Sequence, residues 1–171
     1  MGGREASVWA RKAIRQADMV VFACRGDAPA DALTEIEAFA CEVHPASARR
    51  LVRIHDRRRG EVSGTAAWLK RLPCFMHHHV ALEDQADIES LIRFLSGRAI
   101  GFVAAGGGSL GTAHVGIYQA FRERGAVFDI FVGTSVGSAM AAGFAKNLEA
   151  EHLERGPHEI FDSRPTLRRP T

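Results

Sequence analysis

Two glycine-rich segments hold the residues whose types and spacing could do chemistry. The first, GGGSLGTAHVG (106–116), follows the apolar run AIGFVAA (99–105). The second, GTSVG (133–137), begins at the last residue of the run FDIFVG (128–133). Glycine loses more backbone entropy on folding than any other residue, so this density of glycines indicates a backbone that must approach something closely. A dinucleotide, a phosphate and the oxygen of a reacting carbonyl are the candidates.

The second segment has the G-x-S-x-G pattern of a nucleophile elbow. A strand is predicted before it and a helix of small residues after it, and small flanking residues permit the sharp turn that presents a serine hydroxyl at the carboxyl end of a strand. Ser135 is therefore the candidate nucleophile, and the amides of the following helix favour developing negative charge. The elbow around it comprises Gly133, Thr134, Val136 and Gly137.

The two segments support each other, because both follow the carboxyl ends of consecutive predicted strands. If those strands are neighbours, the amides of Gly107 and Gly108 lie beside the Ser135 hydroxyl. Backbone donors preset around an oxyanion are what acyl transfer requires, and a β-carbon there would crowd the incoming carbonyl. The pair of motifs therefore predicts an ester-cleaving site.

Nucleotide binding is the rival interpretation of the glycines. The G-x-G-x-x-G pattern at 106–111 is typical of a dinucleotide-binding turn, and Asp129 lies about twenty residues further on, where a ribose-binding acid is expected. However, ligands gather at the carboxyl ends of parallel strands, and Asp129 is near the amino end of its run. A phosphate-binding P-loop is disfavoured because no Gly-Lys-Ser/Thr follows the glycines.

Strand and helix patterns alternate along the chain. Such alternation predicts an α/β fold: a mainly parallel, doubly wound sheet in a three-layer αβα architecture, with right-handed crossovers. Gly97 and Gly125 are predicted to end two of the helices. We expect strands at 18–24, 50–55, 74–80, 99–105 and 128–133, and helices at 4–16, 31–43, 65–72, 84–97 and 112–125.

The composition limits which partners and which cellular compartment are expected for the protein. The formal net charge of +2 is too small to indicate nucleic-acid binding, and we interpret the arginine-rich stretches at 48–60 and 164–170 mainly as solvated charge, with anionic lipid headgroups or phosphates as the lesser alternative. The odd set Cys24, Cys41 and Cys74 lacks C-x-x-C spacing, so neither disulfides nor zinc is expected, and a reducing, cytoplasmic setting fits best. No apolar run reaches the roughly 18–20 residues of a membrane span. Lipid would be met from the water side, at the inner face of the membrane.

Histidines offer two further interpretations. Within His77–His79, strand alternation lets only His77 and His79 share a face, and tetrahedral zinc needs another ligand, so we predict hydrogen-bonded, half-buried histidines and no metal or other cofactor. His114, beside the glycine loop, is a candidate base, although a packing or helix-start role is favoured.

The paired motifs resemble the patatin-like phospholipases, and within them the neuropathy target esterase branch and its bacterial relatives. Residues 106–125 are similar to the family's oxyanion block and 128–145 to its nucleophile block. Upstream, IRQADMVVFA, FMHHHV and LIRFLSGRAIGFV are similar to the segment that precedes the catalytic domain in members carrying cyclic-nucleotide-binding modules. The resemblance implies an α/β segment over 1–97 and the N-terminal part of a catalytic domain over 98–171. It also implies that cyclic-nucleotide-binding domains lie upstream in a full-length protein.

The resemblance further implies a lipid acyl hydrolase that acts on a phospholipid or lysophospholipid through a Ser-Asp dyad. Ser135 would be the nucleophile, but the family's later Asp-Gly-Gly or Asp-Gly-Ala motif is missing from this sequence, and Asp129 and Asp162 are disfavoured as substitutes. Leu110 stands where many members have Arg or Lys. The implied oxyanion residues are Gly106, Gly107, Gly108, Ser109 and Gly111.

The missing aspartate leaves a second class of function open, a catalytically incompetent patatin-like module that binds a partner or ligand. A dinucleotide-binding protein is the third alternative.

Overall fold

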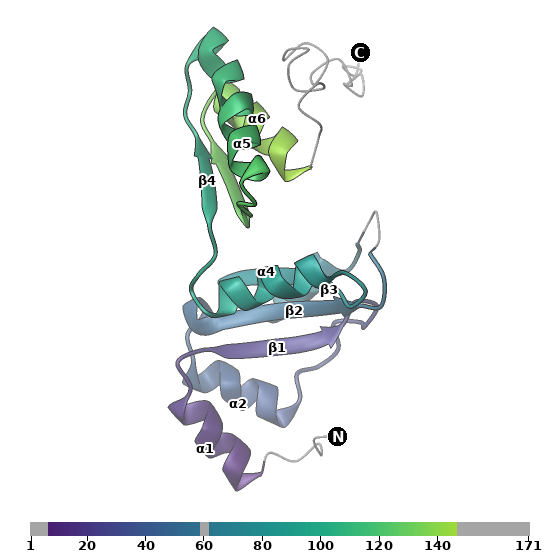
Figure 1. The fold of residues 1–171 in the computed structure, drawn as a ribbon. Helices are drawn as coiled ribbons and strands as arrows, with labels where there is room; N and C mark the ends of the chain where they lie inside the picture. Colours follow the sequence, from purple (N-terminus) through teal and green to yellow (C-terminus); the bar gives the residue numbers. More distant parts are fainter. Residues whose placement is uncertain (1–6, 59–61, 147–171) are drawn as a thin grey trace, which may run out of the picture. The chain divides into compact units, whose positions relative to one another are not determined.

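The computed structural model describes residues 7–58 and 62–146. The chain divides into two compact units, unit 1 up to Ile92 and unit 2 from Arg93, which are described separately (Figure 1).

Unit 1 is built on a three-stranded parallel sheet with strand order β1-β2-β3. All three strands fall where the apolar runs predict them. The strands are β1 (Val20–Arg25), β2 (Arg49–His55) and β3 (Met76–Ala81), and the helices are α1 (Val8–Gln16), α2 (Glu35–Val43), α3 (Thr65–Arg71) and α4 (Gln85–Leu95), with a 3-10 turn at Ala46–Ala48.

The core of unit 1 lies between one face of this sheet and two helices. Phe22 and Leu51 are paired in register, so they point to the same face. There they pack with Ala40 of α2, Trp68 of α3 and Leu72, which follows α3. The indole N–H of Trp68 donates to the carbonyl of Ala28, in the segment between β1 and α2, over 2.9 Å. The alternate residues of β2 are also buried, as expected for a parallel sheet with apolar residues on both faces.

Unit 2 contains two parallel strands with two helices packed against one of their faces. The elements are β4 (Gly101–Ala104), a 3-10 turn at Gly108–Thr112, α5 (Ala113–Glu123), β5 (Ile130–Gly133) and α6 (Val136–Ala145).

An aromatic cluster forms the core of unit 2. Phe102 of β4 packs with Met140 and Phe144 of α6 and Val115 of α5. Tyr118 stacks on Phe144 with ring centroids 4.2 Å apart, and such offset pairs add to the burial of their apolar area. The core therefore fixes both helices against the strands whose carboxyl ends carry the glycine motifs.

The α/β class with parallel strands is confirmed, and the small sheets are consistent with an incomplete patatin-like domain. The described strands pair as two sheets rather than as one continuous sheet. Gly97 and Gly125 have φ of 69° and 78°, a left-handed conformation that glycine adopts without strain, and each follows a helix end as predicted. No helix in the described parts of the chain is both long and apolar enough to cross a bilayer.

Candidate active site

Ser135 occupies a strained turn between β5 and α6. Its φ of 55° and ψ of −129° make it the one non-glycine residue with positive φ in the described ranges. Such a conformation costs about 1–3 kcal/mol and persists only where the surrounding structure imposes it. The turn leaves the Ser135 side chain exposed at the end of the strand, above the first amides of α6.

Glycine is required on both sides of Ser135 because backbone segments touch there. A β-carbon on Gly133 would lie 2.1 Å from the carbonyl oxygen of Gly137, and one on Gly137 would lie 2.2 Å from the carbonyl oxygen of Ala104. Real side chains do not approach backbone so closely, so the two glycines of G-x-S-x-G have a steric reason independent of any substrate. Because Gly137 has no side chain, α6 packs directly against the end of β4.

Hydrogen bonds join the ends of the two strands. Ala104 and Gly133 are paired in register, and the amide of Thr134 donates to the carbonyl of Ala104 over 3.1 Å. The hydroxyl and the amide of Ser138 both donate to the carbonyl of Ser135, over 2.5 and 2.9 Å. The peptide groups on either side of the Ser135 side chain are therefore held in place.

The glycine loop lies against this turn. A β-carbon on Gly106 would be 3.4 Å from the Ser135 Cβ, and one on Gly111 would be 2.5 Å from the Val136 side chain. Gly108 has φ of 55° and faces open space, so its conformation alone favours glycine. The structure thus brings Gly106 and Gly111 to the elbow, with Gly107, Gly108 and Ser109 in the exposed loop between them. Leu110 is 75% exposed in the same loop.

His114 contacts the backbone at the start of the glycine loop. Its Nε2 is 2.9 Å from the carbonyl oxygen of Ala105, and because a carbonyl only accepts, Nε2 must carry the proton and donate. A β-carbon on Gly137 would come within 2.5 Å of the same oxygen. The Ala105 carbonyl is therefore confined between α5 and α6, a packing role of the kind the sequence favours for His114.

No base for Ser135 is found in the described part of the chain: within residues 7–58 and 62–146 its hydroxyl makes no hydrogen bond. Asp129 lies before β5, at the far end from the elbow, and its side chain is 1% exposed. Arg93 donates to both its carboxylate oxygens, over 2.8 and 2.9 Å, and the amide of Ile100 donates to it over 3.1 Å. Asp129 is thus a buried ion-pair partner at the amino edge of the strands, and Asp162 lies outside the described residues.

The histidine run of β3 is engaged within unit 1. His77 is exposed, whereas His79 contacts His55 and Thr65. Burial, followed by the positive charge near His55, Arg53 and His77, lowers the pKa of His79. Within the described residues no group of three His, Cys, Asp or Glu side chains converges as metal ligands would.

Burial is also the main cause that raises the pKa of all three cysteine thiols, which disfavours the reactive thiolate form.

Sequence reasoning did not find the network around Arg53 and His55. Its members come from β2, β3 and α3, far apart in the chain, and only the register of the sheet brings them together. The run of histidines in β3 was the available signal, but nothing in it points to a partner in β2.

Two family profiles match the chain. A family profile described as "Patatin-like phospholipase" matches residues 102–168, and one described as "Neuropathy Target Esterase family P-loop like domain" matches residues 3–100. The chain is therefore a patatin-like protein. More particularly, the chain belongs to the neuropathy target esterase family of the patatin-like phospholipases.

Several curated proteins are similar to the chain. "Lysophospholipase NTE1" of Mycosarcoma maydis is 28% identical over 84% of the chain, and "Patatin-like phospholipase domain-containing protein 7" of Rattus norvegicus is 31% identical over 81%. An NTE family protein of Mycobacterium bovis is 40% identical over 49%. The chain spans only 10%, 12% and 14% of the lengths of these relatives. No solved structure is significantly similar to it.

Proposed function

We propose that the chain provides the nucleophile and the oxyanion site of a serine lipid acyl hydrolase acting on a phospholipid or lysophospholipid ester. One observation carries the proposal: Ser135 is held in a strained strand-to-helix turn with the glycine loop against it. The relative named as a lysophospholipase supports the substrate class.

In the proposed reaction the Ser135 Oγ attacks the ester carbonyl carbon. The carbonyl oxygen becomes an oxyanion that accepts hydrogen bonds from the amides of residues 107–109. Collapse of this intermediate expels the alcohol portion of the lipid and leaves an acyl-serine, which water then hydrolyses to the fatty acid and free serine. Removing one oxyanion donor of this kind typically costs about 2.7–4 kcal/mol of transition-state stabilisation.

The serine proton needs an acceptor. By resemblance to the family this is an aspartate in an Asp-Gly-Gly or Asp-Gly-Ala motif, which the sequence lacks. We therefore propose that the carboxylate base belongs to a part of the longer protein outside this chain, and that the isolated chain turns over esters slowly or not at all.

Fluorophosphonate labelling tests the nucleophile without requiring turnover. The folded chain is treated with a fluorophosphonate, and intact mass and peptide mapping are compared with those of Ser135→Ala and of the control Ser96→Ala, whose hydroxyl lies at the end of α4. We expect one adduct, at Ser135, that is lost in Ser135→Ala and retained in Ser96→Ala. Equal labelling of Ser135→Ala would show that another residue reacts and would overturn the assignment.

The second candidate function is a catalytically incompetent module that binds a partner or ligand. The observation in its favour is the Ser135 hydroxyl, which makes no hydrogen bond in the described parts of the chain. A folded chain that takes no fluorophosphonate favours this second function only if a longer protein that includes the missing carboxylate also fails to label at Ser135.

A further inference from the structure

A cavity of about 340 Å³ opens at the carboxyl edge of the three-stranded sheet of unit 1. His55 ends β2 and Ala81 ends β3, and both line it together with His79. In open α/β sheets, ligands bind outside the carboxyl ends of the strands. The volume lies within the range of about 300–1,000 Å³ that is usual for small-molecule sites. Position and size therefore both fit a ligand site.

A buried cation lies behind this cavity. Arg53 is 1% exposed, and its guanidinium donates to the carbonyls of Gly26 and Ser63 and to the hydroxyl of Thr65. In the part of the chain that the structure describes, no carboxylate pairs with Arg53 and its Nε has no hydrogen-bond partner. Burying a charge without a counter-charge is costly, and the guanidinium of Arg53 is compensated only by the neutral oxygens to which it donates.

A chain of hydrogen bonds connects Arg53 to the cavity wall. The Thr65 hydroxyl is 3.1 Å from Nε2 of His79, and Nδ1 of His79 is 2.9 Å from Nε2 of His55. The two rings stack with centroids 5.2 Å apart. His55 is only 7% exposed, and its remaining nitrogen, Nδ1, has no partner among the described residues. Arg53 Nε and His55 Nδ1 are thus two orphaned buried polar atoms in one network, which is rare in a native structure without a functional reason.

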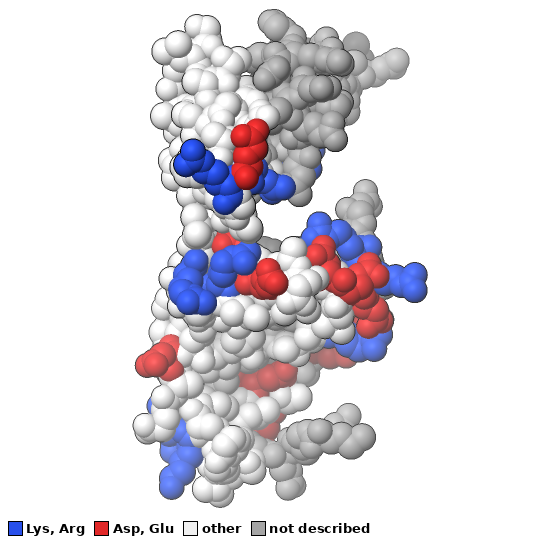
Figure 2. Space-filling view, viewed as in Figure 1, with Lys and Arg blue, Asp and Glu red and all other residues white. Residues whose placement is uncertain are grey.

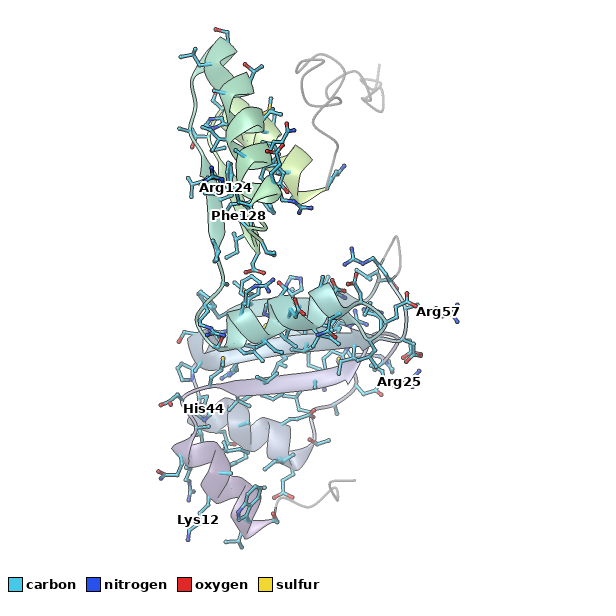
Figure 3. All side chains as sticks on the ribbon, in the orientation of Figure 1. Lys12, Arg25, His44, Arg57, Arg124 and Phe128 are labelled. Carbon is cyan, nitrogen blue, oxygen red and sulfur yellow. The ribbon has the colours of Figure 1, made fainter. Side chains whose placement is uncertain are left out.

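Two arginines stand at the mouth of the cavity. Arg58 donates to the carboxylates of Asp84 and Asp87, over 2.8 and 2.5 Å, and Asp87 also accepts from the amide of Ala81 over 3.0 Å. Arg58 is therefore positioned by two carboxylates that offset its charge, and the carboxylate of Glu83 accepts from its amide over 3.0 Å. Arg57 is exposed and forms no ion pair within the described residues, so its charge is available. It is labelled in Figure 3 at the edge where blue and red side chains gather in Figure 2.

The usual phosphate position of a P-loop-like fold does not fit a ligand here. The segment from β1 to α2, residues 26–34, contains a single glycine and no lysine. The N-terminus of α2 is closed by its own side chains: the Thr34 hydroxyl accepts from the amide of Glu37, and the Glu37 carboxylate accepts from the amide of Thr34 over 2.7 Å. Glu35 adds a further negative charge in the first turn. Negative charge thus disfavours an anion at this helix end, whereas Arg57, in the loop after β2, forms no ion pair among the described residues.

We propose that the cavity between the ends of β2 and β3 binds a small molecule bearing a phosphate group. Arg57 and Arg58 contact the phosphate, and the His55–His79 pair, backed by Arg53, forms the polar wall. The site is independent of the Ser135 chemistry. Its phosphate is carried either by a soluble metabolite or by a lipid headgroup.

Titration of the whole chain with sn-glycerol 3-phosphate tests the proposal, followed by amide ¹H–¹⁵N spectra and calorimetry at constant ionic strength. We expect saturable shifts at the amides of Arg58 and Ala81, with the amides of unit 2 unchanged. Arg57→Ala is expected to weaken binding about tenfold, the value of one charge-assisted hydrogen bond. Arg71→Ala removes the same charge from an exposed position in the last turn of α3 and should bind as the parent does.

Vesicles distinguish the two sources of the phosphate. Flotation with phosphatidylcholine vesicles that contain phosphatidic acid, compared with phosphatidylcholine alone, is measured for the parent chain and for Arg57→Ala. Binding of the soluble phosphate supports a metabolite site; binding only to phosphatidic acid vesicles, lost in Arg57→Ala, supports a headgroup site. The proposal is overturned by the absence of both, or by an equal loss of binding in Arg71→Ala and Arg57→Ala. Because Ser135 has no part in these measurements, failure of the proposed hydrolase leaves their outcome unchanged.

Discussion

Gly137 and Gly116 show how differently two helical glycines of unit 2 respond to a methyl group. A β-carbon on Gly137 would lie 2.2 Å from the Ala104 carbonyl oxygen, whereas nothing lies within 4 Å of one on Gly116, in the middle of α5. The first glycine is required by packing. The second only weakens its helix, because glycine is a poor helix former.

Replacing glycine by alanine is therefore expected to change the free energy of unfolding in opposite directions at Gly137 and Gly116. We expect Gly137→Ala to lower the free energy of unfolding by roughly 1–3 kcal/mol, because α6 must move away from β4. Gly116→Ala should raise it by about 0.5–1 kcal/mol. Urea denaturation followed by circular dichroism measures both. Equal effects of the two substitutions would show that the close contact at the elbow is absent in solution.

Among the elements, α5 holds the glycine loop through a single side chain. The donor at His114 Nε2 fixes the Ala105 carbonyl, and the next peptide leads into Gly106 beside Ser135. This bond has a geometric role, since misplacing catalytic groups by an ångström can cost up to about a hundredfold in rate.

We expect His114→Ala to slow the maximal rate of fluorophosphonate addition at Ser135 by about ten- to a hundredfold while leaving saturation by the inhibitor little changed. His114→Gln, whose amide nitrogen can reach the same carbonyl, should recover part of the rate, and the shorter His114→Asn should not. The measurement is the dependence of labelling rate on inhibitor concentration. A parental rate in His114→Ala of unchanged stability would remove the positioning role.

The elements were predictable from sequence because each strand is a short apolar run and two helices end on glycine. The proximity of the glycine loop to Ser135 also follows from sequence, given that consecutive parallel strands end at the same edge. The buried pairing of Asp129 with Arg93 and the network of Arg53, His55 and His79 did not follow. Those contacts join residues 12 to 36 positions apart, which no local pattern specifies.

At the scale of the whole molecule, the two histidines with a lowered pKa both lie in unit 1 and make its stability depend on pH. Burial lowers the pKa of both His78 and His79, so below the ordinary value of 6.5 the unfolded chain binds protons that the folded chain excludes. The contribution of these histidines is therefore complete above pH 6.5 and is lost as pH falls through their lowered pKa values.

We expect the urea midpoint of unit 1 to be constant from pH 8 to about 7 and to fall as the pH decreases below about 6.5. Both tryptophans belong to unit 1, and Trp9→Phe leaves buried Trp68 as the sole fluorescent reporter. Comparison with far-ultraviolet circular dichroism then separates unit 1 from the rest of the chain. A midpoint that rises on acidification, or does not move, would contradict the burial of these two rings.

The backbone contacts of Gly133 and Gly137 also affect how a motif should be interpreted in a lineage. Selection for folding alone retains both glycines, since any side chain there collides with main chain. Under the proposed function, only selection for catalysis retains Ser135, whose φ of 55° and ψ of −129° glycine would adopt with less strain. A descendant that has lost its chemistry would therefore keep the glycine frame and change the residue between them. Under the proposed function, the residue between the two glycines, rather than the glycines themselves, is therefore the position at which related sequences should differ.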